Sequence, residues 1–106
     1  MGSGINLRAL PPLKALRGFE AATRHQSIRA AASELCLTPP AINHQIQAIE
    51  DMLGVRLFAQ DGRHVVSSDA GQVFYPYVRA AFESLIEGVE AVRRQAQDEE
   101  EREPLE

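Results

Sequence analysis

Apolar residues recur at helical spacing in three stretches of the first half of the chain, and each stretch begins with a residue that suits a helix start. The first stretch follows Pro11-Pro12, where a missing backbone N–H does no harm. Its core stripe is predicted to be Leu13, Leu16 and Phe19. Steps of three residues place these side chains on one face of a helix. We predict that this helix ends at Arg24 or His25.

Two shorter amphipathic stretches follow, and a tight turn at Cys36-Leu37 separates them. Ser27 and Thr38 are the expected N-caps, because a side-chain oxygen there accepts a backbone N–H of the first turn. Gly54 ends the second of the two stretches as a left-handed cap. The inward faces are Ile28, Ala31, Ala32 and Leu35 in one stretch, and Ala41, Ile42, Ile46, Ile49 and Leu53 in the other. Two short helices joined in this way predict a helix-turn-helix, which places its second helix in the major groove of DNA.

A pair of β-prone segments and a longer helix complete the pattern. Val55–Phe58 and His64–Ser67 are predicted strands, and the turn signal at Gln60–Arg63 makes them a two-stranded wing. Ser68 begins the last helix, and Pro76 is expected to kink it or free one carbonyl. The later apolar positions step by four and three residues, which forms a heptad seam. The predicted fold class is mainly α: a winged helix-turn-helix, with three helices and a two-stranded wing, followed by a long dimerisation linker helix.

Polar side chains near the N-terminus of the third helix are of the types that read base edges. The exposed face there holds Pro39, Pro40, Asn43, His44 and Gln47. Phosphate contacts are expected from two capping hydroxyls and a flanking cation, which are Ser27, Thr38 and Arg29. In the wing, Arg63 is the candidate for insertion into the minor groove. Each has a simpler alternative: a cap, a helix-initiating proline, or a solvated polar face or turn.

The heptad seam of the last helix has two interpretations. The helix could pack back on its own domain, which suits Val73, Phe74 and Tyr77 near the wing. The later apolar residues lie beyond that domain, because a helix advances about 1.5 Å per residue, and a monomer would leave them in water. We favour a homodimer that forms through Val78, Phe82, Leu85, Val89 and Val92.

Charge is divided unevenly along the chain. Residues 1–67 hold seven Lys or Arg and five Asp or Glu, a net of +2, whereas residues 68–106 hold four and ten, a net of −6. The weakly basic part, residues 1–67, is compatible with DNA binding although the formal net charge of the whole chain is −4. The single cysteine, Cys36, excludes an internal disulfide. The sequence has no long apolar run and no leader peptide, so we expect a soluble, cytoplasmic, nucleoid-associated protein.

These patterns divide the chain into four parts. Residues 1–9 are an N-terminal extension whose first four residues resemble a tag remnant, and residues 10–67 are the winged helix-turn-helix DNA-binding domain. Residues 68–97 are the linker and dimerisation helix. Residues 98–106 are an acidic tail that is expected to be disordered and to end in a cloning remnant.

A long string of residues resembles the N-terminal DNA-binding domain of LysR-type transcriptional regulators. The matching positions are Leu10–Ala22, Ser27-Ile28, Ala31-Ala32, Leu35, Thr38–Ile42, Gln45-Ile46, Ile49-Glu50, Leu53–Phe58, Arg63 and Ser68–Gly71. The resemblance implies a linker helix that pairs two subunits antiparallel on a dyad-symmetric operator in double-stranded DNA. It also implies a longer parent regulator, with an effector-binding domain that this chain lacks and with RNA polymerase as a further partner.

The chain departs from the family pattern on the DNA-facing side. Asn43 replaces the usual serine, His44 the usual arginine, and Gln60 the first of the common wing arginines. With two cations absent, we expect weaker and more salt-sensitive DNA binding than in typical relatives. The alternative function is a winged-helix protein-interaction module with weak or no DNA binding, which would lack a steep salt dependence. The histidines and Cys36 do not fall at metal-ligand spacing, and no catalytic set is present, so no metal, cofactor or enzymatic activity is expected.

Overall fold

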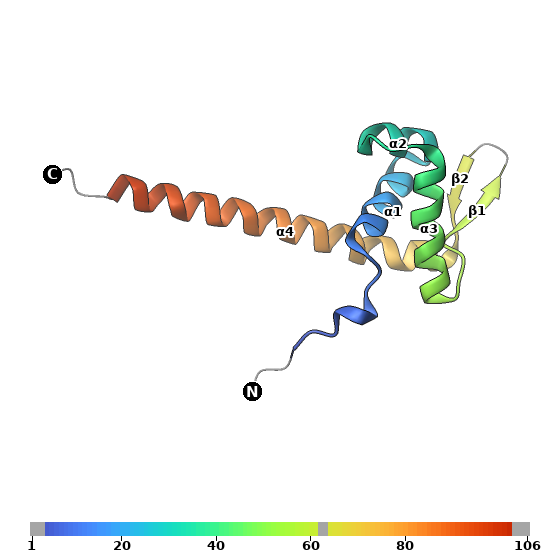
Figure 1. The fold of residues 1–106 in the computed structure, drawn as a ribbon, viewed down its shortest axis with the longest axis horizontal. Coiled ribbons are helices and arrows are strands. Elements are labelled where there is room, and N and C mark those ends of the chain that lie inside the picture. Colours follow the sequence, from blue (N-terminus) through green and yellow to red (C-terminus); the bar gives the residue numbers. More distant parts are fainter. Residues whose placement is uncertain (1–3, 62–63, 103–106) are drawn as a thin grey trace.

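A computed structural model of the chain describes residues 4–61 and 64–102. In chain order its elements are a 3-10 helix (Leu7–Ala9), α1 (Leu13–His25), α2 (Ile28–Leu35), α3 (Pro39–Leu53), β1 (Phe58–Asp61), β2 (His64–Ser67) and α4 (Asp69–Arg102). The first three α-helices and the wing gather at one end of α4, and the rest of α4 projects away from them (Figure 1). The predicted fold class is confirmed, a mainly helical winged helix-turn-helix followed by a long helix.

Local capping chemistry sets the helix ends as the sequence predicted. The Ser27 hydroxyl accepts a hydrogen bond from the backbone N–H of Ala30 at 3.0 Å, and the Thr38 hydroxyl accepts one from Ala41 at 3.3 Å. Gly54 ends α3 with a φ of 75°, in the left-handed region that glycine adopts without strain. The turn between α2 and α3 uses the same conformation at Cys36, whose φ is 57°. Helix α1 ends at His25, as expected.

Two apolar clusters form the core. In the first, small side chains let α1 and α2 approach each other closely under α3; its buried members are Ala21, Ala22, Ala31, Ala32, Ile42 and Ile46. The second is centred on Phe19, which is completely buried. The Phe19 ring lies 5.7 Å from Phe58 of β1, 5.5 Å from Phe74 and 6.2 Å from Tyr75 of α4, measured between ring centroids. This aromatic group holds the wing and α4 against α1.

Of the predicted core stripe of the first helix, Phe19 is buried and Leu16 is partly buried against the core, but Leu13 is not. Leu13 is 58% exposed, because the buried face of α1 runs through Ala15, Phe19 and Ala22, at steps of four and three residues. Leu53, the last residue of α3, is also exposed. Both leucines stand at helix ends, and Leu13 lines an open pocket with Phe82, Leu85 and Ile86 of α4.

The wing begins later than expected. Strand β1 pairs antiparallel with β2 from Phe58 opposite Ser67 to Asp61 opposite His64, so Val55–Phe58 was the wrong segment. The reason is that the chain before Phe58 is held by other elements. The backbone N–H of Leu57 donates to the Glu50 carboxylate of α3 at 2.8 Å, and the Leu57 carbonyl accepts from Ser68 at 2.9 Å. The turn residues 62–63 lie outside the described residues, and with them Arg63.

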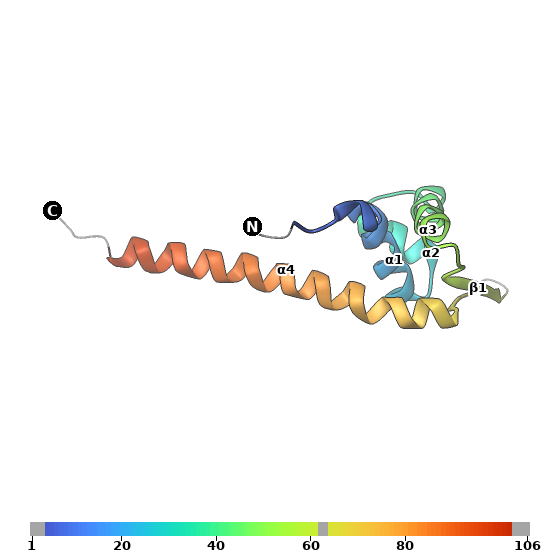
Figure 2. The ribbon, with the colours of Figure 1, turned by 90° about the horizontal axis from the view of Figure 1, so that it is seen from below.

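Helix α4 lies with its first turns against α1 and the wing (Figure 2). Gly71 is required at this contact, because a Cβ there would lie 2.3 Å from the Leu57 carbonyl oxygen. Phe74 and Tyr75 pack on the core, whereas Val73 and Tyr77, which we had expected to pack beside the wing, are exposed. The helix continues to Arg102, so its expected end at residue 97 is wrong and residues 98–102 are helical rather than disordered. Within residues 4–61 and 64–102, none of the helices has the length and apolar character needed to cross a bilayer.

Candidate nucleic-acid interface

The outer face of α3 presents every residue that was predicted to read bases. Ile42, Ile46 and Ile49 are buried on the inner face. The residues at the intervening positions are exposed: Pro39, Pro40, Asn43, His44 and Gln47. Because residues three and four positions apart share a helix face, the five form one surface at the N-terminal half of α3. The Gln47 amide donates to Asp51 of the same helix at 2.9 Å, which holds its side chain along the helix.

The predicted phosphate-binding residues are placed around the start of α2 and α3. Ser27 and Thr38 both use a hydroxyl lone pair for capping, which leaves the hydroxyl proton of each free to be donated elsewhere. Arg29 is exposed on the first turn of α2. The ion pairs found in the described part of the chain involve other arginines.

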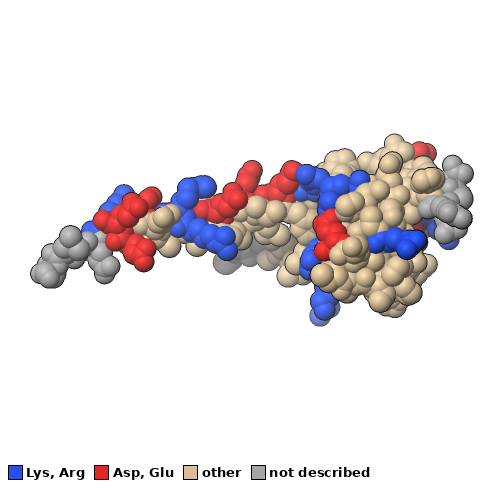
Figure 3. Space-filling view, turned by 90° about the horizontal axis from the view of Figure 1, so that it is seen from above, with Lys and Arg blue, Asp and Glu red and all other residues tan. Residues whose placement is uncertain are grey.

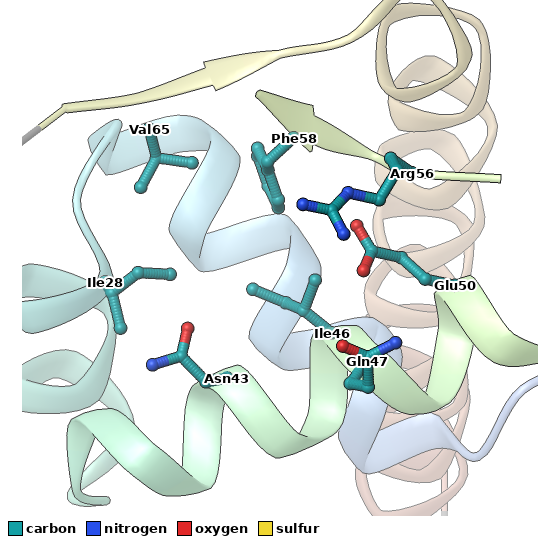
Figure 4. Close-up of a pocket in the computed structure, with 8 residues that line it drawn as sticks. All are labelled: Ile28, Asn43, Ile46, Gln47, Glu50, Arg56, Phe58 and Val65. Carbon is teal, nitrogen blue, oxygen red and sulfur yellow. The ribbon is translucent and has the colours of Figure 1, made fainter. Parts of the chain in front are cut away.

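A groove separates α3 from the wing (Figure 4). Asn43, Gln47 and Glu50 line it from α3, and Arg56 lines it from the segment that enters β1. Spacing does not single out Arg56, although it lies in the stretch Leu53–Phe58 that resembles the family. An isolated arginine within an apolar stretch acquires a place beside α3 only through the fold. Glu50 accepts a hydrogen bond from the Leu57 N–H.

Most acidic residues in the described part of the chain lie on α4, whereas α3 carries Glu50 and Asp51 and no Lys or Arg. Figure 3 shows acidic and basic side chains interspersed along the projecting part of α4. The acidic residues of that part are Glu83, Glu87, Glu90, Asp98, Glu99, Glu100 and Glu101. Most of the negative charge therefore lies away from α3, but Glu50 and Asp51 keep the C-terminal half of α3 acidic.

The seam residues of α4 fall into two groups. Val78 is only 5% exposed and belongs to the core of its own domain, so it is not available to a second subunit as predicted. Phe82 is half-buried against the same cluster. Leu85, Val89 and Val92 are exposed, and Ile86, which the seam had not included, is exposed beside them. The heptad spacing was correct, but spacing alone does not reveal which neighbour covers a given position.

Glu20 of α1 lies at the centre of a polar network that the sequence did not reveal. Its carboxylate is half-buried and accepts hydrogen bonds from Arg24, from the Tyr75 hydroxyl at 2.9 Å and from Arg79 at 3.5 Å. The bonds from Arg24 lower the pKa of Glu20, against an opposing effect of burial. Arg24 also binds Glu34 of α2 at 2.8 and 2.9 Å and, with His25, lowers the pKa of Glu34 to about 2. The network therefore connects α2, α1 and α4.

The fold and its exposed polar helix define a protein of the winged helix-turn-helix class. Residues 13–72 match the family described as "Bacterial regulatory helix-turn-helix protein, lysR family". The chain belongs to this family.

Named relatives agree with this assignment. The chain is 42% identical over 80 residues to the glycine cleavage system transcriptional activator of Escherichia coli K12, and 47% identical over 88 residues to the transcriptional regulator TrpI of Pseudomonas aeruginosa. The matches cover 76% and 83% of this chain but only 26% and 30% of the relatives. The chain thus spans less than a third of the length of these regulators.

Solved structures of similar size are those of DNA-binding domains. One is titled as the complex of the BenM DNA-binding domain with benA site 1 DNA, with a TM-score of 0.74 and 33% identity; 80% of this chain and 96% of that chain are covered. The complex of the CbnR DNA-binding domain with DNA has a TM-score of 0.71 and 29% identity, and covers 80% of this chain and 98% of that chain.

Proposed function

We propose that this chain is the DNA-binding region of a bacterial transcription regulator and that it binds double-stranded DNA sequence-specifically as a homodimer. The observation that carries the proposal is the exposed polar face on the N-terminal half of α3, in a chain similar over four-fifths of its length to domains solved on DNA. Each subunit places α3 in one major groove of a dyad-symmetric operator. The site of action is the nucleoid in the cytoplasm, and no enzymatic activity is part of the proposal.

The chemistry of the face assigns roles to its residues. Asn43 and Gln47 have amides that pair with adenine, His44 donates to guanine or a phosphate, and Pro40 packs on a thymine methyl. Phosphates are held by Ser27, Arg29 and Thr38. Pro39 starts α3 on the groove-facing side, and Arg63 of the wing is proposed to insert into the minor groove. The contacts that pair the subunits come from Leu85, Val89 and Val92, with Phe82 at the edge of its own domain core.

Selection from a random DNA library with the purified chain tests the proposal. We expect the unaltered chain to select a dyad-symmetric consensus. The double variant Asn43→Ala/His44→Ala should no longer select it. The control Gln97→Ala, far along α4, should select the same consensus. Affinity for the consensus should fall steeply as salt rises, because phosphate contacts release counterions. Absence of any consensus at low salt would instead favour the protein-interaction module. The relatives give that alternative no support, since the neighbours of similar size were solved with DNA.

A further inference from the structure

Helix α4 contains a proline near the point where it leaves the domain. Pro76 lies inside the helix and has no N–H for the carbonyl of Gln72, and its ring crowds that carbonyl. Val78 is the last buried residue of α4, Phe82 is half-buried, and every residue from Glu83 to Arg102 is exposed. A proline at this position weakens the helix where its direction is determined.

Glu20 of α1 binds α4 on both sides of this break. Tyr75 directly precedes Pro76 and donates its hydroxyl proton to Glu20 at 2.9 Å. Arg79 follows Pro76 by three residues and donates to Glu20 at 3.5 Å and to the Tyr75 hydroxyl oxygen at 3.2 Å. The side chain of Glu20 is only 13% exposed and is fixed in place by Arg24. The two turns of α4 that flank the proline are therefore joined through one carboxylate of another helix.

We propose that Glu20 is a positioning residue that clamps α4 across Pro76 and thereby fixes the angle between α4 and α3. In the homodimer of the proposed function, on which this inference rests, that angle determines how far apart the two α3 helices stand. Glu20 is not proposed to contact DNA, because it lies on α1 and acts through Tyr75 and Arg79.

The length of α4 makes the angle consequential. From Pro76 to Arg102 the helix extends about 39 Å at about 1.5 Å per residue. A rotation of about 10° at Pro76 would displace the far end by about 7 Å relative to α3, which exceeds the rise of about 3.4 Å per base pair. A dimer without the clamp would therefore accept half-sites at more than one spacing.

The single cysteine of the chain offers a direct measurement. Cys36 is exposed and stands in the turn before α3, so a nitroxide label on it reports one distance between the two subunits of a dimer. By pulsed electron paramagnetic resonance we expect a narrow distance distribution for the unaltered chain. Glu20→Gln and Tyr75→Phe should broaden it by about 7 Å, the displacement estimated from the helix length. Glu83→Gln is the matched control, because its pair with Arg79 lies within α4 alone, and the distribution should stay narrow.

A second background separates a clamp from a general structural role. In Pro76→Ala the backbone N–H is restored, and the helix is continuous at this point without the Glu20 clamp. In this background Glu20→Gln should no longer broaden the distribution. Equal broadening in both backgrounds would overturn the clamp. An unchanged distribution in Tyr75→Phe would also overturn the clamp. Tyr75→Phe loses only the hydroxyl and retains the packed ring, so it tests the clamp even if Glu20→Gln fails to fold.

The same experiment distinguishes this inference from the proposed function. If the unaltered chain gives no distance between subunits, the homodimer itself is wrong and the spacing role is overturned with it. If the unaltered chain gives a narrow distance that none of the variants changes, the homodimer stands and only the clamp is overturned.

Discussion

The Tyr75 hydroxyl donates a 2.9 Å hydrogen bond to the carboxylate of Glu20, across 55 positions of sequence. The bond joins α4 to α1 at the edge of the aromatic cluster around Phe19, so polar and apolar contacts meet at the root of the long helix. The arrangement makes the direction of α4 a property of the domain rather than of the helix alone.

The ionised network predicts acid sensitivity. The pKa values of Glu20 and Glu34 are both lowered from the ordinary 4.5, that of Glu34 to about 2, chiefly by hydrogen bonds from Arg24. Carboxyls with a depressed folded-state pKa stabilise the fold above the unfolded value and lose this contribution as the pH falls through the folded value. The melting temperature should therefore fall between pH 5 and pH 2.

The matched variant for this prediction is Glu20→Gln/Glu34→Gln, which has no carboxyl to protonate at these positions. Its melting temperature, followed by circular dichroism, should fall less over the same pH interval. Because Glu34 is exposed, solvent screens its pair and the difference should shrink in added salt. Parallel curves for the two proteins would contradict the assignment.

The burial of Phe19 predicts a large loss of stability on truncation. Phe19→Ala removes a fully buried ring that contacts β1 and α4, and such changes cost about 3–5 kcal/mol. Urea unfolding measures the effect. Leu13→Ala, at an exposed position of the same helix, should change the free energy of unfolding by no more than about 0.5 kcal/mol. A comparable loss in both variants would show that the buried face of α1 is assigned incorrectly.

The exposed arginine at the start of α2 predicts a salt effect. If Arg29 contacts a phosphate, Arg29→Gln should weaken binding to consensus and non-consensus DNA alike and reduce the slope of log K against log salt by about 1. Asn43→Ala should instead cost about 1–3 kcal/mol on the consensus alone. Fluorescence anisotropy at several salt concentrations measures both. An unchanged slope for Arg29→Gln would remove this residue from the interface.

The apolar strip on α4 predicts the oligomeric state. Val89→Glu introduces a charge among Leu85, Ile86 and Val92 and should yield a monomer by sedimentation equilibrium. Val73→Glu alters another exposed valine of α4, outside this strip, and should remain dimeric. Dissociation by both substitutions, or by neither, would argue against pairing through the strip.

Local chemistry explains which features the sequence could predict. Helix ends were predictable because each cap bonds to a backbone group no more than four residues away. This holds for Ser27, Thr38 and Gly54, whose roles therefore follow from the sequence alone. The exposed face of α3 was also predictable, because the spacing of Ile42, Ile46 and Ile49 defines its opposite. The roles of the exposed residues toward DNA remain predictions.

Features that depend on distant partners were missed. Val78 has the spacing of a seam residue, but α1 and its neighbours cover it. The segment before Phe58 is β-prone, yet Glu50 and Ser68 take its hydrogen bonds. The spacing of polar residues does not distinguish Glu20 or Arg56 from other surface positions. The fold places Tyr75 beside Glu20 and α3 beside Arg56.

Ser68 stands between the wing and α4 and fastens both. Its hydroxyl donates to the Arg56 carbonyl at 2.6 Å and accepts from Gly71 at 3.0 Å, while its N–H donates to Leu57. These three hydrogen bonds at one residue hold the wing firmly against the start of α4. We expect a displacement of the wing to move the first turn of α4 with it, because both adjoin Ser68.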